Sequence, residues 1–463
     1  MHSHRTRTAA VAVAAPPTGS QKAPGLYPYL ISSVAAISGI LFGFDIAVIN
    51  GAIVYLQDEF HLSPAATELA ASSLLLGCVF GAAIGGWLSD RYGRRKILSV
   101  AALLFAVSSI AAALPRTIVQ FEAARFLGGI GIGVASMLAP LYIAEVSPAR
   151  VRGLLVSLNQ MAIVSGILLS YLANWGLSFL GPTSWRWMFA TAAVPSVLLF
   201  AGLLFVPESP RWLAERGRED EALGILERIG GAEAGLRELN DIKNSLTAED
   251  GSWGELLLPQ MRRPLLLGIG LAVFSQITGI NAVLFYGSLI LEKQLGMHNH
   301  SSALGVNVSI GVINFLGTIV ALAAIDRVGR KPLLMLSAGV MALCQLSLGF
   351  AFFMSNPPVF LIVGSMLICV AVFAIGLGPA TWVLLSELFP TRIRGRATSI
   401  ANGCLWSACS ALTASFLSLV KALTISGAFW IYAVMCALAF VLVWRAVPET
   451  KGKSLEEIEA LWR

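Results

Sequence analysis

The stretch DRYGRRK at residues 90–96 stands between two long apolar runs, and a close copy, DRVGRKP, stands at residues 326–332. Two further pairs follow in the same order: EVSPARVRG (145–153) with ELFPTRIRG (387–395), and PESPR (207–211) with PETKG (448–452). The copies lie 236, 242 and 241 residues apart, which is hard to obtain by chance. The repeats therefore predict two similar halves, with a binding site between them.

The runs that flank these repeats are long enough to cross a bilayer. Of the 463 residues, 56% are hydrophobic and 13% charged, whereas a soluble domain usually carries about 25% charged residues. A membrane helix needs about 20 apolar residues, and these runs are too continuous for barrel strands. The predicted fold is an all-α polytopic membrane protein, with twelve transmembrane helices in two pseudo-symmetric six-helix bundles. The candidate spans are 28–52, 66–89, 97–115, 118–143, 154–178, 187–206, 264–291, 303–325, 332–354, 358–387, 397–419 and 425–446.

A polar gap divides the spans into two groups of six. Within it, Ala222, Ile225, Leu226 and Ile229 follow the spacing of an amphipathic helix, and a simple tether is the alternative. The predicted divisions are an N-terminal tail (1–27), an N-terminal bundle (28–207), a linker with short amphipathic helices (208–260), a C-terminal bundle (261–447) and a C-terminal tail (448–463).

The charges of the chain indicate its orientation rather than a nucleic-acid surface. The net charge is +6, but arginine and lysine occur in short clusters between apolar runs. Alternate loops hold twelve of these residues and the opposite loops hold four. The positive-inside rule then places both termini and the linker in the cytoplasm. We expect an integral protein of the plasma (inner) membrane, with the lipid bilayer as a partner and no nucleic acid.

Several ordered strings resemble the sugar porter family of the major facilitator superfamily, nearest to bacterial proton-coupled xylose and glucose symporters. They are GWLSDRYGRRK (86–96), RFLGGIGIGVASMLAPLYIAEVSPARVRG (125–153), PESPRW (207–212), QITGINAVLFY (276–286), GPATWVLLSELFPTRIRG (378–395) and PETKG (448–452). The resemblance implies symport of a small neutral monosaccharide with a proton by alternating access, as a monomer. It implies no enzyme, no metal and no cofactor beyond the coupling proton. A passive sugar facilitator, a polyol or inositol carrier and a non-transporting sugar sensor remain alternatives.

Asp45 and Arg125 are charged residues inside apolar spans, where a charge is costly without a partner or a proton. Desolvation raises the pKa of a carboxylic acid and a nearby arginine lowers it. We therefore hypothesise that Asp45 alternates between a protonated state and a pair with Arg125, so that conformation switches proton affinity. The resemblance implies the same role, since proton-coupled members carry an acid here. A fixed structural ion pair is the alternative.

Four amides and one tryptophan match the sugar-contact positions of the family: Gln160, Gln276, Asn281, Asn314 and Trp382. Neutral amides both donate and accept hydrogen bonds, and an aromatic ring suits the C–H face of a sugar. Interhelical hydrogen bonding is the alternative role for each amide. Tyr286 is expected to act as an outer gate residue. Gly279, Gly287, Gly376, Gly378 and Pro379 are expected to break the seventh and tenth spans near the site.

Three positions depart from the family pattern. Ser275, Phe285 and Leu405 stand where the family often has glutamine, tyrosine and asparagine or glutamine. Each change removes a polar group from the expected pocket, so the preferred sugar can differ from that of the best-known members. Asn402, one turn before Leu405, is a possible substitute.

Paired charges recur in the loops of both halves. The resemblance implies a cytoplasmic gating network that favours the outward-open state. The alternative is that these charges only set the membrane topology through the positive-inside rule. Its members are Asp90, Arg94, Glu145, Arg152, Asp326, Arg330, Glu387 and Arg394.

Overall fold

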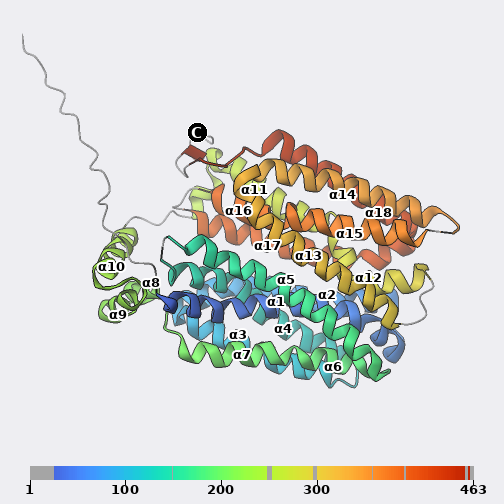
Figure 1. Cartoon of the computed structure of the whole chain (residues 1–463), viewed down its shortest axis with the longest axis horizontal. Coiled ribbons are helices and arrows are strands. Elements are labelled where there is room, and N and C mark those ends of the chain that lie inside the picture. Colours follow the sequence, from blue (N-terminus) through green and yellow to red (C-terminus); the bar gives the residue numbers. More distant parts are fainter. Residues whose placement is uncertain are drawn as a thin grey trace, which may run out of the picture.

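The structure is a computed structural model that describes residues 25–148, 150–247, 253–295, 300–356, 358–389, 393–453 and 457–458. Almost all of the expected N-terminal tail lies outside these residues, as does Asn299 of a possible glycosylation sequon at 299–301. Long helices run side by side in two groups, and α8, α9 and α10 lie together at one end, on the left in Figure 1. We call this the linker end and the opposite end the distal end.

The N-terminal half crosses the molecule six times, and its sixth crossing consists of two short helices. The elements are α1 (Leu26–Phe60), α2 (Pro64–Tyr92), α3 (Arg94–Ala113), α4 (Ile118–Glu145), α5 (Arg152–Leu177), the 3-10 turn η1 (Ser178–Leu180), α6 (Ser184–Thr191) and α7 (Ala193–Phe205).

The C-terminal half repeats this arrangement, with its first and fourth crossings each divided in two. The elements are α11 (Pro259–Ile277), α12 (Ile280–Leu295), α13 (His300–Val328), α14 (Arg330–Phe353), α15 (Val359–Ile375), α16 (Leu377–Glu387), α17 (Arg394–Thr413) and α18 (Phe416–Ala446). The predicted all-α fold of two six-helix bundles is confirmed.

Among the described residues, eleven helical stretches are long and apolar enough to span a membrane. The remaining crossing, α17, has 20 residues but carries Arg394, Arg396 and Asn402 among several serines. It packs between α2 of the other half and α11 of its own half. Contact with both halves explains why this crossing can be less apolar than the others, because a membrane helix tolerates polar groups where it packs against protein.

Two of the five predicted positions separate helices, whereas Gly287 lies inside α12 and Gly378 and Pro379 lie inside α16. Gly279 separates α11 from α12 with a φ of +85°, a conformation that glycine adopts without strain. Gly376 separates α15 from α16. The last two span boundaries differ from the sequence prediction, since α17 ends at Thr413 and α18 already begins at Phe416. A bend at Thr424 divides α18, so its first turns were assigned to the preceding span.

The linker forms α8 (Pro210–Glu215), α9 (Glu219–Gly230), α10 (Ala232–Thr247) and the 3-10 turn η2 (Trp253–Leu257). The first three enclose a small apolar cluster of Trp212, Leu213, Ala222, Leu226 and Leu239. The indole of Trp212 donates to the carbonyl of Asp90 at 2.8 Å, which fixes this cluster to the turn between α2 and α3. The helices are therefore anchored to the N-terminal half.

The repeated Pro-Glu motif has a structural role in each half. Glu208 accepts the backbone N–H of Arg95 at 3.0 Å, and Glu449 accepts those of Arg330 and Lys331 at 3.1 and 3.0 Å. Each carboxylate thus caps the N-terminus of the third crossing of its own half, where N–H groups lack partners.

Replacement of Gly93 by alanine should test this cap. Gly93 has a φ of +104°, and a Cβ there would lie 2.4 Å from the Glu208 carboxylate. We expect Gly93→Ala to destabilise the protein by more than about 1 kcal/mol, measured as a fall in Tm in detergent. Gly217→Ala is the control, because its φ is +72° but no atom lies within 4 Å of the added Cβ. Equal Tm values for the two variants would refute a specific role for the Glu208 contact.

Candidate functional site

Asp45 and Arg125 form a buried pair between α1 and α4. Arg125 donates through Nη1 to Oδ1 of Asp45 and through Nη2 to the Asp45 carbonyl at 3.2 Å. The two side chains are 3% and 2% exposed, respectively. Phe189 covers the guanidinium, whose central carbon lies 5.1 Å from the ring centroid. The sequence had paired these residues across 80 positions, and the structure places them in contact.

The pair leaves one carboxylate oxygen unused. Asp45 Oδ2 is buried and has no hydrogen-bond partner, and the same is true of Arg125 Nε. A buried acceptor without a partner is costly, so this oxygen is a suitable place for a proton. The geometry is compatible with a carboxyl group that is neutral in one state and ion-paired in another.

Gln276 and Asn281 meet across the break between α11 and α12. The Asn281 amide donates to the Gln276 side-chain oxygen at 3.0 Å and to its carbonyl at 3.1 Å. The Gln276 amide donates in turn to Ser275 Oγ at 3.1 Å. These contacts are local to the break, so they do not join distant helices.

The other predicted sugar contacts have unused polar groups. Among the described residues, the side chains of Gln160 on α5, Asn314 on α13 and Trp382 on α16 make no hydrogen bond. Gln160 is half-buried, and Trp382 keeps 38% of its surface exposed. Interhelical hydrogen bonding, the alternative for these amides, is therefore not what occupies Gln160 and Asn314 here.

Tyr286 is completely buried at the distal end of the C-terminal half. Its hydroxyl donates to the Thr413 carbonyl at 2.6 Å, and its ring stacks on Phe416 with centroids 5.1 Å apart. These contacts link α12 to the α17–α18 connection. The structure does not bring Tyr286 into hydrogen-bonding contact with the predicted sugar residues that it describes.

The loop charges form equivalent ion pairs at the linker end of each half. In the first copy, Arg94 lies 3.1 Å from Asp90 and 3.3 Å from Glu145. In the second, Arg330 lies 3.0 Å from Asp326 and 2.9 Å from Glu387. All four pairs join residues of the same half. The acids expected from the sequence are thus partnered, but within a bundle.

Arg152 and Arg394, the other two arginines of the set, share a backbone contact with Arg94 and Arg330, which bond carbonyls five residues earlier at 3.3 and 3.2 Å. Arg152 bonds the Ser147 carbonyl and pairs with Glu238 of α10 at 3.1 Å. Arg394 donates to the Phe389 carbonyl at 3.3 Å. Each arginine therefore reaches a carbonyl five residues earlier in the chain, and Arg152 also connects the bundle to the linker helices.

Asn50 on α1 connects the two halves and was missed by the sequence analysis. Its amide donates to the Leu284 carbonyl of α12 at 2.8 Å, and its oxygen accepts the N–H of Ser288 at 2.9 Å. These two backbone groups would pair with each other in a regular helix. The Asn307 amide donates to the same oxygen at 3.2 Å. Asparagine inside the apolar run at 46–54 was the signal available.

Further contacts join the halves at the same end. Tyr171 on α5 donates to the Leu284 carbonyl at 3.2 Å, and the hydroxyls of Ser178 and Ser301 lie 3.0 Å apart. Glu68 on α2 accepts from Ser418 on α18. In this conformation the distal ends of the two halves are therefore held together.

Comparison with known proteins gives the family. The family model "Sugar (and other) transporter" matches residues 31–462. The chain belongs to the sugar transporter family. It is thus a membrane transporter rather than an enzyme, and the expected membership is confirmed.

Relatives of this sugar transporter are similar along nearly their whole length. The arabinose-proton symporter of Bacillus subtilis is 42% identical over 444 residues, with 94% of each chain covered. The D-xylose-proton symporter of Escherichia coli is 40% identical over 474 residues, with 94% of this chain and 96% of the relative covered. The inward-open structure of the xylose transporter XylE from E. coli has a TM-score of 0.83 and 38% identity, covering 94% and 100% of the two chains.

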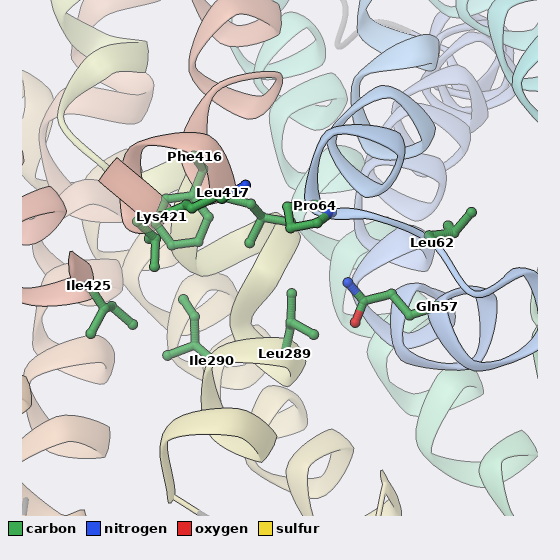
Figure 2. A pocket seen from close by; sticks show the side chains of 10 residues that line it. Gln57, Leu62, Pro64, Leu289, Ile290, Phe416, Leu417, Lys421 and Ile425 are labelled. Atoms are coloured by element: carbon green, nitrogen blue, oxygen red, sulfur yellow. The ribbon is translucent and has the colours of Figure 1, made fainter. Parts of the chain in front are cut away.

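Two cavities lie at the distal end of the transporter, away from the predicted sugar residues. One of about 620 Å³ is lined by Tyr55, Asp58, Ser178 and His300 among others. The other, of about 230 Å³, is mostly apolar (Figure 2). It lies between α1 and α2 of one half and α12 and α18 of the other. Pro64 of the N-terminal half and Leu417 of the C-terminal half both line this cavity. Both cavities are lined by residues of the two halves.

Proposed function

We propose that the chain is a sugar/H+ symporter that works by alternating access. The observation that carries this proposal is the buried Asp45–Arg125 pair with its unpartnered carboxylate oxygen, in a chain of the sugar transporter family. A proton on Asp45 weakens its attraction to Arg125, so protonation and conformation become linked. In a passive facilitator the pair would be a fixed structural ion pair, and Asp45 would not bind and release a proton during the cycle.

The proposed substrate is a small neutral aldose, with pentoses the first candidates. Relatives at 42% and 40% identity are named for arabinose and xylose. Gln160, Gln276, Asn281 and Asn314 would bind hydroxyls and Trp382 would stack on the sugar ring. Ser275, Phe285 and Leu405 would leave the pocket with fewer polar groups. The Asn402 oxygen is buried without a partner, so it would be available as a substitute.

The proposed orientation places the linker end in the cytoplasm and the protein in the plasma membrane, as a monomer. The support is the excess of arginine and lysine in loops on the linker side. With the distal ends joined, the conformation would then be inward-facing. Tyr286 would belong to the closed outer gate, and the pairs around Arg94 and Arg330 would rearrange when the linker ends meet.

Proton uptake coupled to sugar influx tests the function. In liposomes with an internal pH dye, addition of xylose or arabinose should acidify the lumen. Sugar influx without acidification would indicate a facilitator, and binding without influx a sensor. A response to inositol but to neither pentose would indicate a polyol carrier.

Gln276→Leu should weaken sugar binding by about tenfold or more, because a lost hydrogen bond that strands a polar group costs about 1–3 kcal/mol. The measurement is the Kd for xylose and arabinose on purified protein by calorimetry. Gln57→Leu is the matched control, since Gln57 is a half-buried amide that bonds Thr67 at the distal end. Unchanged affinity in Gln276→Leu would remove this residue from the site.

A further inference from the structure

The buried carboxylate of Glu68 is not used by the mechanism proposed above. Glu68 lies near the start of α2 and is 3% exposed. Its Oε1 accepts the backbone N–H of Ser418 at 2.6 Å, and its Oε2 accepts the Ser418 hydroxyl at 2.6 Å. A buried carboxylate is costly unless its oxygens are hydrogen-bonded. Both donors here belong to the opposite half of the molecule.

The N-terminus of α18 lacks a cap from its own sequence. Ser415 is the N-cap residue, but its hydroxyl donates backwards to the carbonyls of Ala411 and Leu412 at 2.7 and 3.3 Å. Ser418 is the third residue of the helix, so its N–H has no acceptor within the helix. A carboxylate at this end also meets the positive end of the helix dipole. Glu68 thus supplies across the interface the cap that Ser415 does not.

The neighbouring contacts place this cap beside the proposed outer gate. Phe416, the first residue of α18, stacks on Tyr286 and lines the same cavity as Pro64 and Leu417. Among the described residues, the ion pair between the halves at this end is longer and more exposed than the Glu68 contact. Asp58 is 75% exposed, and its Oδ2 lies 3.6 Å from Nε2 of His300. The Glu68 contact is therefore the buried polar bond between α2 and α18.

We infer that Glu68 is a latch residue that holds the distal end closed by capping α18 from the other half. Separation of the distal ends exchanges both hydrogen bonds for water, so the latch favours the closed arrangement without preventing its opening. The inference rests on the proposed alternating-access function, because only then must α2 and α18 separate during the cycle.

Distance measurement between spin labels tests the latch. Arg116→Cys and Ser355→Cys, in a background without the six native cysteines, place labels on exposed distal-end loops of opposite halves. In the labelled parent protein, which retains Glu68, we expect the short distance between the two labels to dominate. Glu68→Ala should raise the ratio of long to short distances about tenfold, since two hydrogen bonds of one state are lost. Glu68→Asp, too short to reach both donors, should shift the ratio in the same direction by less.

Glu59→Ala is the matched control. This carboxylate lies at the same end but bonds Trp185 and Arg186 of its own half, so its loss should leave the distances unchanged. Parental distances in folded Glu68→Ala would overturn the latch. If Glu68→Ala does not fold but Glu68→Asp does, distances in Glu68→Asp equal to those of the parent would overturn the latch. The experiment uses neither sugar nor a proton gradient, so its failure is distinguishable from failure of the symport assay.

Discussion

Asp45→Asn should abolish sugar accumulation while leaving sugar exchange largely intact. Asparagine can still accept from Arg125, so the α1–α4 contact survives, but it cannot carry a proton. With one proton per sugar, a pH difference of one unit supports about tenfold accumulation, since one pH unit is worth about 1.4 kcal/mol. The variant should equilibrate the sugar without concentrating it. The measurement is labelled-sugar uptake into liposomes, with and without a pH gradient.

The control for this prediction is Asp58→Asn. Asp58 lies on the same helix, but its side chain is 75% exposed, so it should retain accumulation. The decisive contrary result is concentrative uptake by Asp45→Asn at the parental level. In that case the Asp45–Arg125 pair would be a fixed structural ion pair, and the coupling proton would have to bind elsewhere.

The fold was predictable because its determinants are local. A run of apolar residues long enough for a bilayer must form a helix, and the repeated DRYGRRK and DRVGRKP strings relate the two halves without any knowledge of their packing. Gly279 and Gly376 marked the helix breaks for the same reason. The division between α17 and α18 was not predictable, since the bend at Thr424 depends on packing that the apolar pattern does not encode.

The site was predictable where a residue is chemically out of place. A carboxylate and a guanidinium inside apolar spans require a partner, which identified Asp45 and Arg125 as a pair. Asn50 and Glu68 were equally unusual in their helices, but their partners are largely backbone groups of the opposite half. A backbone partner has no side-chain signature in the sequence. Polar residues that join two halves in one conformation therefore require the structure.

Asn50→Ala should have the second large effect, on the rate of transport. The Asn50 side chain makes three hydrogen bonds to α12 and α13, and its loss leaves the Leu284 carbonyl and the Ser288 N–H with fewer partners in the closed distal end. At about 1 kcal/mol or more for each bond, the closed state should lose about 2–3 kcal/mol, or roughly 30- to 150-fold in population. Water can satisfy the same groups once the distal ends separate.

The proper comparison for Asn50→Ala is Asn174→Ala. Asn174 is also buried, but its amide bonds the Ala47 and Val48 carbonyls of its own half at 3.4 and 3.3 Å. Removing it should lower Tm without altering the balance between conformations. We expect sugar exchange in liposomes to slow about tenfold or more in Asn50→Ala, and less than about threefold in Asn174→Ala, for protein of equal folded content. Equal slowing in both variants would mean that Asn50 contributes to stability alone. A selective loss in Asn50→Ala would instead show that closure depends on an α1 side chain that binds the broken seventh crossing through its backbone.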